Sequence, residues 1–333
     1  MAEVTATSFI VLGIALFMLL NSAAITVYAE RRIAGFIQNR IGPNRVGPFG
    51  LLQPIADVLK LLLKEDVTPV DGNRFLHTVS PMIPVVTALM TVAVIPFGDG
   101  LYATDINAGV LYLLAVASLG VYGVTLAGWA SNSKYSLLGG LRAAAQMISY
   151  ELPLGMAVAS VVIFVGSLSV VDIAVAQETW WFVFLNPLGA LIFIIAAFAE
   201  SNRTPFDLVE AEQELVGGFH TEYSSMKFGM FFLAEYMHVV ISSMLMVTFF
   251  FGSYHLPFAG YWLPELSPLV KGILDVTVFI AKTAFFVFLF IWVRWTIPRF
   301  KFNQVMKLGW SRLLPLSIIN FIVIAGILYF IVG

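Results

Sequence analysis

The segment at residues 199–223 reads AESNRTPFDLVEAEQELVGGFHTEY, and it differs in character from the chain on either side. It holds six carboxylates and a single cation, Arg203, although a long apolar run flanks it at each end. Desolvating a carboxylate costs several kcal/mol, so acids beside a bilayer are either fully solvated or retained for function. The six are Glu200, Asp207, Glu210, Glu212, Glu214 and Glu222.

Several of these acids are spaced so that they share one side of a helix. If residues 208–216 are helical, Asp207, Glu210 and Glu214 lie on one face while Glu212 points away. Neighbouring carboxylates do not all ionise easily at once, so such a row can hold protons jointly, as a proton relay requires. The alternative is a solvated acidic loop, but apolar residues alternate with the acids, and a purely solvated loop has no use for them.

The composition around this segment is that of a membrane protein. The chain has 333 residues, of which 59% are hydrophobic and 11% charged, and its mean hydropathy is +0.91. A typical soluble domain is about one-quarter charged. We therefore expect an all-α polytopic integral membrane protein.

The sequence contains no pattern for a bound redox group. There is no cysteine, which excludes disulfides and thiolate-held iron-sulfur clusters, and no two of the four histidines are four residues apart. Nucleotide-binding glycine motifs are also absent. We expect this chain to hold no flavin, iron-sulfur cluster or metal and to bind no nucleic acid, so partner proteins must supply any redox chemistry.

Hydropathy predicts about eight membrane-spanning helices in a single transmembrane domain, residues 1–333. The first run has no basic residues before it and is long enough to span, so we expect a retained helix and not a cleaved signal. The predicted spans are residues 8–29, 79–98, 108–130, 147–169, 183–200, 228–252, 270–293 and 313–332.

The basic residues predict the orientation of these helices. Of the 18 Lys and Arg residues, 16 fall in alternate connections, and the opposite connections hold only Lys271 at a helix start. By the positive-inside rule the basic connections are cytoplasmic and both termini lie outside. The two main cytoplasmic loops are then residues 30–78 and the acidic loop at 200–227.

The first of these loops contains its own helical pattern. A coil rich in Gly and Pro at residues 38–50 precedes a segment, residues 50–64, in which apolar residues recur at helical spacing. That segment is too short and too polar to span, so it is suited to lie in the membrane interface. The alternative is a simple packing helix.

A few charged residues fall inside the predicted spans. Glu235 and Lys282 lie deep enough that burial without a role is expensive, so we favour function for both. His238 follows Glu235 on the same helical face. Glu151 and Asp275 lie closer to the ends of predicted helices. A charged residue there snorkels to the membrane surface or caps the helix as often as it has a function.

Six motifs resemble a known family over residues 28–315. They are ERRI at 30–33, QNRIGPNRVGPFGLLQPIADVLKL at 38–61, SNSKY at 131–135, SYELPL at 149–154, ESNRTPFDLVEAEQELVGGF at 200–219 and RWTIPRF at 294–300. The chain resembles the quinone-site membrane subunit (subunit 1 in mitochondria) of respiratory complex I, the proton-pumping NADH:quinone oxidoreductase.

The resemblance implies that the cytoplasmic loops form the membrane half of a chamber in which a quinone such as ubiquinone is the substrate. No catalytic residue is assigned, because in the family the groups that protonate the quinone belong to a neighbouring subunit. By position, the quinone-binding residues would be Arg31, Phe36, Gln38, Arg40, Asp57, Phe219, Arg294 and Arg299.

The resemblance also implies a charged path that couples this chamber to proton translocation. A change of charge at the quinone would shift the protonation of adjacent carboxylates and so drive transfer. The acids that match the family's path are Glu151, Glu200, Asp207, Glu210, Glu212, Glu214, Glu222 and Glu235.

The implied partners are the other complex I subunits in a bacterial inner (plasma) membrane. They comprise the peripheral-arm quinone-site and iron-sulfur subunits, the small membrane subunits and the antiporter-like subunits. Two alternatives remain open: the homologous membrane subunit of an energy-converting hydrogenase, in which no quinone binds, and a stand-alone ion transporter. The absence of an internal repeat counts against the transporter.

Overall fold

The computed structural model describes residues 6–208, 215–257 and 267–332. Within these ranges the regular elements are helices, and extended backbone pairs only in an isolated bridge between Gly98 and Leu101. The expected all-α membrane protein is confirmed, because seven helices among the described residues are long and apolar enough to cross a membrane. They are α1 (Ala6–Ile37), the run from α3 (Arg74–Val79) through α4 (Met82–Thr91) to η2 (Val92–Val94), α5 (Gly109–Ala130), α6 (Lys134–Val165), α11 (Ser225–Phe250), α13 (Pro268–Thr296), and α14 (Phe302–Leu308) continued by η4 (Gly309–Leu313) and α15 (Leu314–Val332).

The fifth predicted span, residues 183–200, is divided into two helices. α8 (Phe182–Leu185) ends just before Asn186, and α9 (Pro187–Glu200), with 14 residues, begins directly after it. Asn186 caps α9, because its side-chain oxygen accepts from Gly189 N at 2.9 Å, and proline suits the first helical position. The span is therefore represented by an apolar helix shorter than the other seven.

The fourth span begins earlier than hydropathy predicts. We expected it to start at residue 147, but α6 starts at Lys134 and runs for 32 residues. Residues 134–146 are rich in the helix formers Leu and Ala, yet their charges and glycines lower the hydropathy. Glu151 consequently lies in the middle of a long helix and not near its start.

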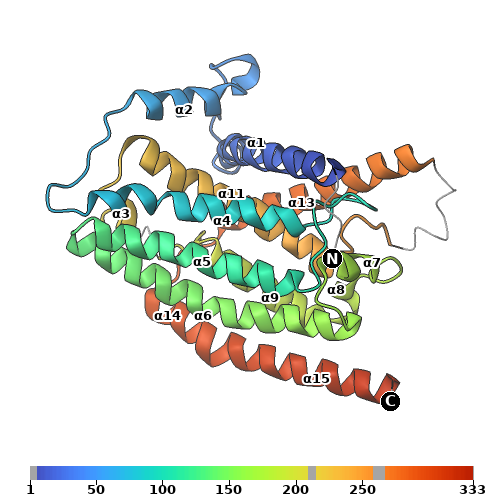
Figure 1. Ribbon diagram of the computed structural model, residues 1–333. Helices are drawn as coiled ribbons and strands as arrows, with labels where there is room; N and C mark the ends of the chain where they lie inside the picture. The colour runs from blue at the N-terminus through green and yellow to red at the C-terminus, as the bar shows by residue number, and fades with distance from the viewer. Residues whose placement is uncertain (1–5, 209–214, 258–266, 333) are drawn as a thin grey trace.

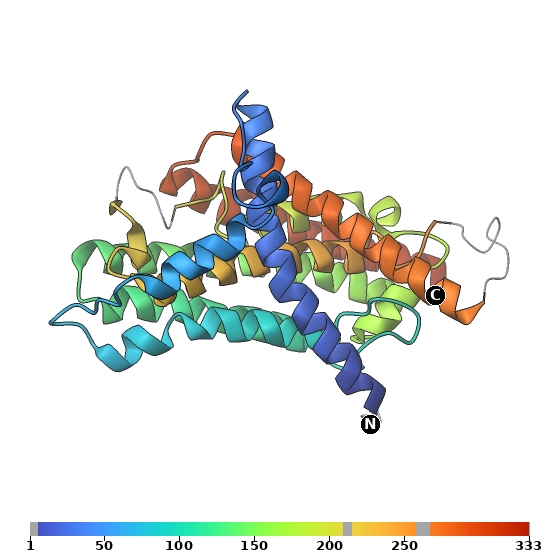
Figure 2. The same ribbon diagram turned by 90° about the horizontal axis from the view of Figure 1, so that it is seen from above.

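The helices form an elongated bundle with α1 and α13 oblique to the rest (Figure 1, Figure 2). α5 packs on α6, α6 on α9 and α15, and α11 on α1, α4 and α13. Both chain ends lie toward the end of the bundle away from α3 and α14 (Figure 1).

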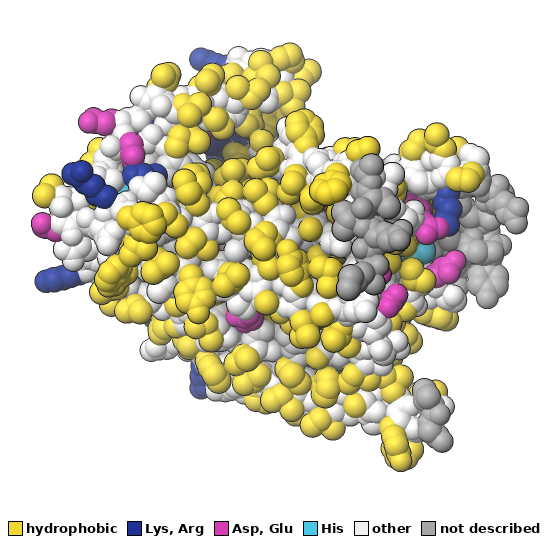
Figure 3. Space-filling model, in the orientation of Figure 1, with side chains coloured by type: hydrophobic (Ala, Val, Ile, Leu, Met, Phe, Trp, Pro, Cys, Tyr) yellow, Lys and Arg dark blue, Asp and Glu magenta, His cyan; other side chains and the backbone are white. Residues whose placement is uncertain are grey.

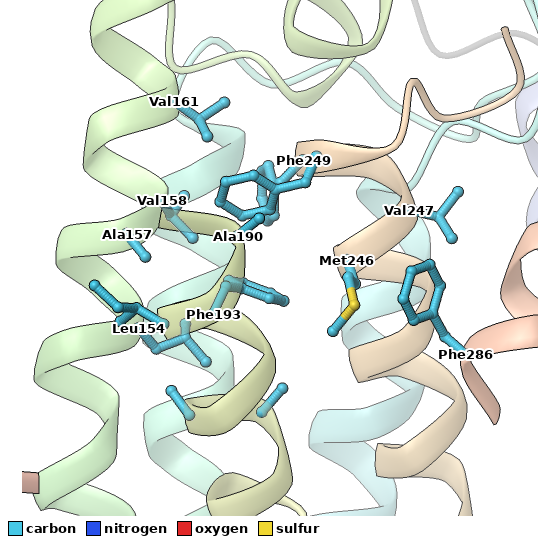
Figure 4. Close-up of a cluster of buried hydrophobic side chains, with 14 of the residues drawn as sticks. Leu154, Ala157, Val158, Val161, Ala190, Phe193, Met246, Val247, Phe249 and Phe286 are labelled. Carbon is cyan, nitrogen blue, oxygen red and sulfur yellow. The ribbon is translucent and has the colours of Figure 1, made fainter. Parts of the chain in front are cut away.

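The main core lies between α6, α9, α11 and α13 (Figure 4). Leu154 and Val158 of α6 face Phe193 of α9, and Phe249 and Phe286 complete the cluster from α11 and α13. Apolar side chains also cover much of the outer surface, while charged ones gather toward its two ends (Figure 3). This distribution suits a body surrounded by hydrocarbon with ends in water.

The amphipathic helix of the first loop is α2 (Gln53–Leu63), and it projects from the bundle (Figure 1). Helix α2 buries none of its residues, and Ile55, Leu59 and Leu62 are exposed. Its end is attached to the start of α11, because Ser225 Oγ donates to Leu61 O at 3.0 Å. Helix α2 thus contacts α11 and α1 along one side and leaves an apolar side exposed.

Candidate functional site

A buried ion-pair cluster joins α1, α11 and α13 to the start of the acidic loop. Glu30 pairs with two arginines, lying 2.5 Å from Arg294 Nη1 and 3.4 Å from Arg203 Nη1. Arg203 Nε lies 2.8 Å from Glu235 Oε1. Only 5% of Glu30 and 3% of Arg203 are exposed. Two acids and two arginines balance one another, so the cluster carries no uncompensated buried charge.

Arg203 is the centre of this cluster. Its guanidinium carbon lies 4.1 Å from the centre of the Tyr236 ring, a cation–π contact. Burial disfavours the charged guanidinium, but Glu235, Tyr236 and Glu30 more than offset this and raise the pKa of Arg203 above its ordinary value. Arg203 therefore remains a cation that holds two carboxylates from different helices.

The turn after α9 explains why Arg203 points inward. Asn202 has a φ of 51°, in the left-handed region that asparagine tolerates better than most residues. Gln146 of α6 fixes this turn, since its Nε2 donates to Ala199 O at 2.8 Å and to Asn202 Oδ1 at 3.2 Å. The chain thereby reverses at the end of α9 and returns Arg203 to the bundle.

A cavity of about 60 Å³ lies beside the cluster and brings two acids of the predicted proton path together. Glu200 at the end of α9 and Glu235 of α11 both line it, together with Asn202 of the turn. Phe219, predicted as a quinone-binding residue, lines this same cavity. Its ring packs edge-on against that of Phe231, with the ring centres 4.9 Å apart. Phe219 thus lies with the acids and not with the other predicted quinone residues of α1.

The other predicted quinone residues before α11 lie in α1, just after it, or in α2. Arg31 Nη1 pairs with Asp57 Oδ2 of α2 at 2.5 Å, and Arg40 Nε donates to Gln38 Oε1 at 2.6 Å. Phe36 is 72% exposed. The structure therefore brings Arg31 together with Asp57 and Gln38 together with Arg40, and it leaves Phe36 exposed between them in sequence.

A second ion pair joins the acidic loop to the segment after α13. Arg299 Nη2 lies 2.8 Å from Asp207 Oδ2, and Asp207 is buried while Arg299 is partly exposed. Phe300 N also donates to Pro205 O at 3.0 Å. The predicted quinone residue Arg299 is thus held by a predicted proton-path acid.

The remaining predicted acids fall partly within the described residues and partly outside them. Glu151 of α6 accepts a hydrogen bond from Ser118 Oγ of α5, and its charge acts on Glu200. Glu222 is half-buried near His77. Three further acids lie outside the described residues: Glu210, Glu212 and Glu214. Most of the expected helix at residues 208–216 lies outside them as well.

The sequence predictions missed Glu30 and Arg203 as site residues. The first predicted span ended at residue 29, which placed Glu30 outside it, whereas α1 continues to Ile37. Two signals pointed to the pair: Arg203 is the one cation among the acids, and a glutamate next to an apolar span needs a partner.

Metal binding finds no support in this geometry. Across residues 6–208, 215–257 and 267–332, no three His, Cys, Asp or Glu side chains are grouped so that they could hold an ion. The ion pairs and the cavity instead provide groups that can exchange protons and respond to a nearby charge.

Comparison with known proteins gives matches over almost the whole chain. The model of a family described as NADH dehydrogenase matches residues 9–325. NADH-quinone oxidoreductase subunit 8 of Rhodothermus marinus is 58% identical over 322 residues, which cover 93% of this chain and 94% of that protein. A NADH-quinone oxidoreductase subunit of Salinibacter ruber is 56% identical over 323 residues, covering 94% and 93%. A subunit of the same enzyme from Rhodospirillum centenum is 50% identical over 313 residues, covering 93% and 90%.

Proposed function

The chain belongs to the NADH dehydrogenase family, and from that premise we propose that it forms the membrane wall of a quinone-binding chamber and couples quinone reduction to proton translocation. Its relatives are subunits of NADH-quinone oxidoreductase. The electrons come from partner subunits, and this chain contributes the quinone surface and the path for protons.

An apolar groove supports the quinone half of the proposal. A cavity of about 630 Å³ lies between α1, α11 and α13, and its lining is almost wholly apolar. Its lining includes Thr26, Ala29 and Ile33, so it reaches the part of α1 that carries Arg31. Ligand pockets of about 300–1,000 Å³ with mostly apolar walls and a few polar groups are typical of small-molecule sites. An isoprenoid tail fits the groove, while Arg31, Gln38 and their partners orient the head.

One observation carries the coupling half: the ion-pair cluster connects the two predicted sites. Arg294, a predicted quinone residue, pairs with Glu30, and Glu30 contacts Arg203, which contacts Glu235 on the cavity. Within a low-dielectric interior, a new charge at one end of such a chain changes the protonation preference at the other. Reduction of the quinone would therefore change the protonation of Glu235 and Glu200.

Photo-crosslinking tests the quinone half directly. The complex that contains this chain would be purified from membranes and irradiated with a photoreactive quinone analogue. Peptide mapping would then locate the labelled residues. We expect labelling within residues 31–64 or 200–225 that excess quinone abolishes. Absence of labelling in this chain, with the analogue attached elsewhere in the complex, would instead favour the hydrogenase-type or transporter alternatives.

Charge-neutral variants of the acidic loop test the proton half. Replacing Glu212 or Glu214 with glutamine removes a titratable group but keeps its size, so proton pumping in proteoliposomes should fall. Quinone reduction accompanied by normal pumping in both variants would defeat the proposed carboxylate path.

A further inference from the structure

Two histidines line the cavity that separates Glu200 from Glu235, and neither has a role in the path described above. His220 enters from η3 (Gly218–His220), and His238 from α11. His238 follows Glu235 by three residues, so both project from one face of the helix toward the cavity.

The neighbouring helix leaves space for the His238 ring. Gly120 of α5 lines the same cavity, and a Cβ added there would lie 3.9 Å from His238 Cε1. The ring therefore packs directly over a position without a side chain.

The cavity has the size and the lining to hold water. A volume of about 60 Å³ exceeds the ~10–15 Å³ that one enclosed water needs, so a few waters fit. Ser201 and Asn202 add polar groups to those of the acids and histidines. Such waters bridge polar groups that are too far apart for a direct hydrogen bond.

We propose that His238 is a proton-transfer residue that exchanges protons between Glu235 and Glu200 through water in this cavity. This inference rests on the proposed coupling function and assigns it a further residue. The ring nitrogen that faces the cavity accepts a proton from the Glu235 carboxyl group by way of water and then releases it by way of water to the Glu200 carboxylate, while the other nitrogen keeps its hydrogen bond to the Pro84 backbone. Glu235 ends as a carboxylate, Glu200 ends protonated, and the imidazole returns to its neutral form.

The charges around His238 suit this role. Arg203 lies 2.8 Å from Glu235, so a fixed cation stands beside the acid from which the proton leaves. The titratable groups that face the ring across the cavity are Glu235 of its own helix, Glu200 of α9 and His220 of η3. The lining residues from α4, α5 and α6 do not titrate: Pro84, Gly120, Val124 and Met147.

Histidine also suits the chemistry better than the neighbouring carboxylates alone. Imidazole can both accept and release a proton at one ring nitrogen, so the nitrogen that is not bonded to the Pro84 backbone suffices for the transfer.

The test uses the intact complex in proteoliposomes, with NADH-driven proton uptake and quinone reduction measured from pH 5.5 to 8. His238→Asn keeps a polar side chain but removes titration. We expect both rates to fall by about one order of magnitude, which is less than the 10²–10⁴ of a fully blocked acid–base step because cavity water partly substitutes. The pH profile should also differ from that of the wild type, because asparagine does not titrate.

Two further variants control for structure. His255→Asn changes a histidine that lies beyond the end of α11 and does not line the cavity, and it should keep the wild-type rates and pH profile. In His238→Ala, added imidazole should restore part of the lost rate, which a purely structural role would not allow. A wild-type rate and profile in His238→Asn would overturn the inference, as would the absence of imidazole rescue.

A parallel Glu235→Gln variant separates this inference from the function on which it rests. If Glu235→Gln lowers pumping while His238→Asn does not, the role of His238 is wrong and the path through Glu235 stands. If neither variant lowers pumping, the proposed path through the cavity fails as well.

Discussion

Arg203 is held on two sides by carboxylates that reach it from different helices. Glu30 comes from α1 and Glu235 from α11. Removing one partner from a buried pair leaves an uncompensated charge, whereas an exposed pair contributes little. The same chain contains both kinds of pair.

We expect Arg203→Met to destabilise the folded chain by about 3–5 kcal/mol, because Glu30 and Glu235 would lose their shared counter-charge. The matched control is Lys271→Met, which breaks the pair of Lys271 with Asp99 at 2.7 Å. Both of those side chains are more than half exposed, so the cost should stay within about 1 kcal/mol. Thermal inactivation of the purified complex in detergent compares the two. Equal losses of stability in the two variants would show that the buried Arg203 pairs contribute no more to stability than the exposed Lys271 pair does.

His255 gives a prediction for the pH dependence of stability. Burial, reinforced by the charge of Lys282, lowers the pKa of His255 below its ordinary value. In the unfolded chain His255 binds a proton as the pH falls below about 6.5, whereas in the folded chain it stays neutral at that pH. Folding stability is therefore lost as the pH falls through that value. His255→Gln should lessen the decline in thermal stability between pH 7.5 and 5.5. A decline as steep as in the wild type would contradict this account.

For single residues, the sequence predicted which charged side chains are of interest better than it predicted which side chains they contact. Glu235, Glu200 and Arg294 were selected as residues of interest, and the structure places all three in or beside the cluster. Arg203 and Glu30 are 173 residues apart, and hydropathy carries no signal for a contact at that separation.

The junction of α11 and α13 depends on one lysine. Lys282 Nζ, near the middle of α13, donates to the carbonyl oxygens of Phe251, Ser253 and His255 at 2.8, 2.9 and 2.6 Å. The ammonium group also lies 4.3 Å from the centre of the Trp181 ring. Its three N–H donors thus satisfy carbonyl groups exposed where α11 ends.

Lys282→Met should detach the end of α11 from α13, because three carbonyl oxygens would lose a charged donor. We expect a loss of about 3 kcal/mol or more in the stability of the folded chain, given roughly 1.5–3 kcal/mol for each hydrogen bond to a charged group and incomplete additivity. Limited proteolysis of the 251–257 connection in the complex measures the effect. Unchanged protection in Lys282→Met, compared with Thr277→Val on the same helix, would contradict the proposed attachment.

Helix identity was easier to predict than helix extent. Long apolar runs located the membrane helices, but the first turns of α6 and the last turns of α1 are helical despite their polar residues. Both extensions are fixed by contacts with other helices, since Gln146 holds the turn after α9 and Glu30 joins the cluster. Such tertiary contacts override local hydropathy, so their effect was outside what the sequence could show.

Across the whole molecule, the predicted quinone surface and the predicted proton path meet at the buried cluster. Arg294, a predicted quinone residue, pairs with Glu30, Glu30 contacts Arg203, and Arg203 contacts Glu235, which lines the cavity between α5, α9 and α11. Resemblance to a family supplied the two roles, and the fold supplies the physical connection that a sequence cannot reveal. In the proposed function, charge changes at the quinone reach the proton path through this connection.

Glu30→Gln tests that coupling most directly, because it removes the charge that joins Arg203 to Arg294 while leaving the surface and the cavity acids in place. The measurement is the number of protons taken up per NADH oxidised, together with the rate of quinone reduction, in proteoliposomes containing the intact complex. We predict that both values fall below those of the wild type. Wild-type values for both in Glu30→Gln would contradict the account, since quinone reduction and pumping would then be coupled without the cluster.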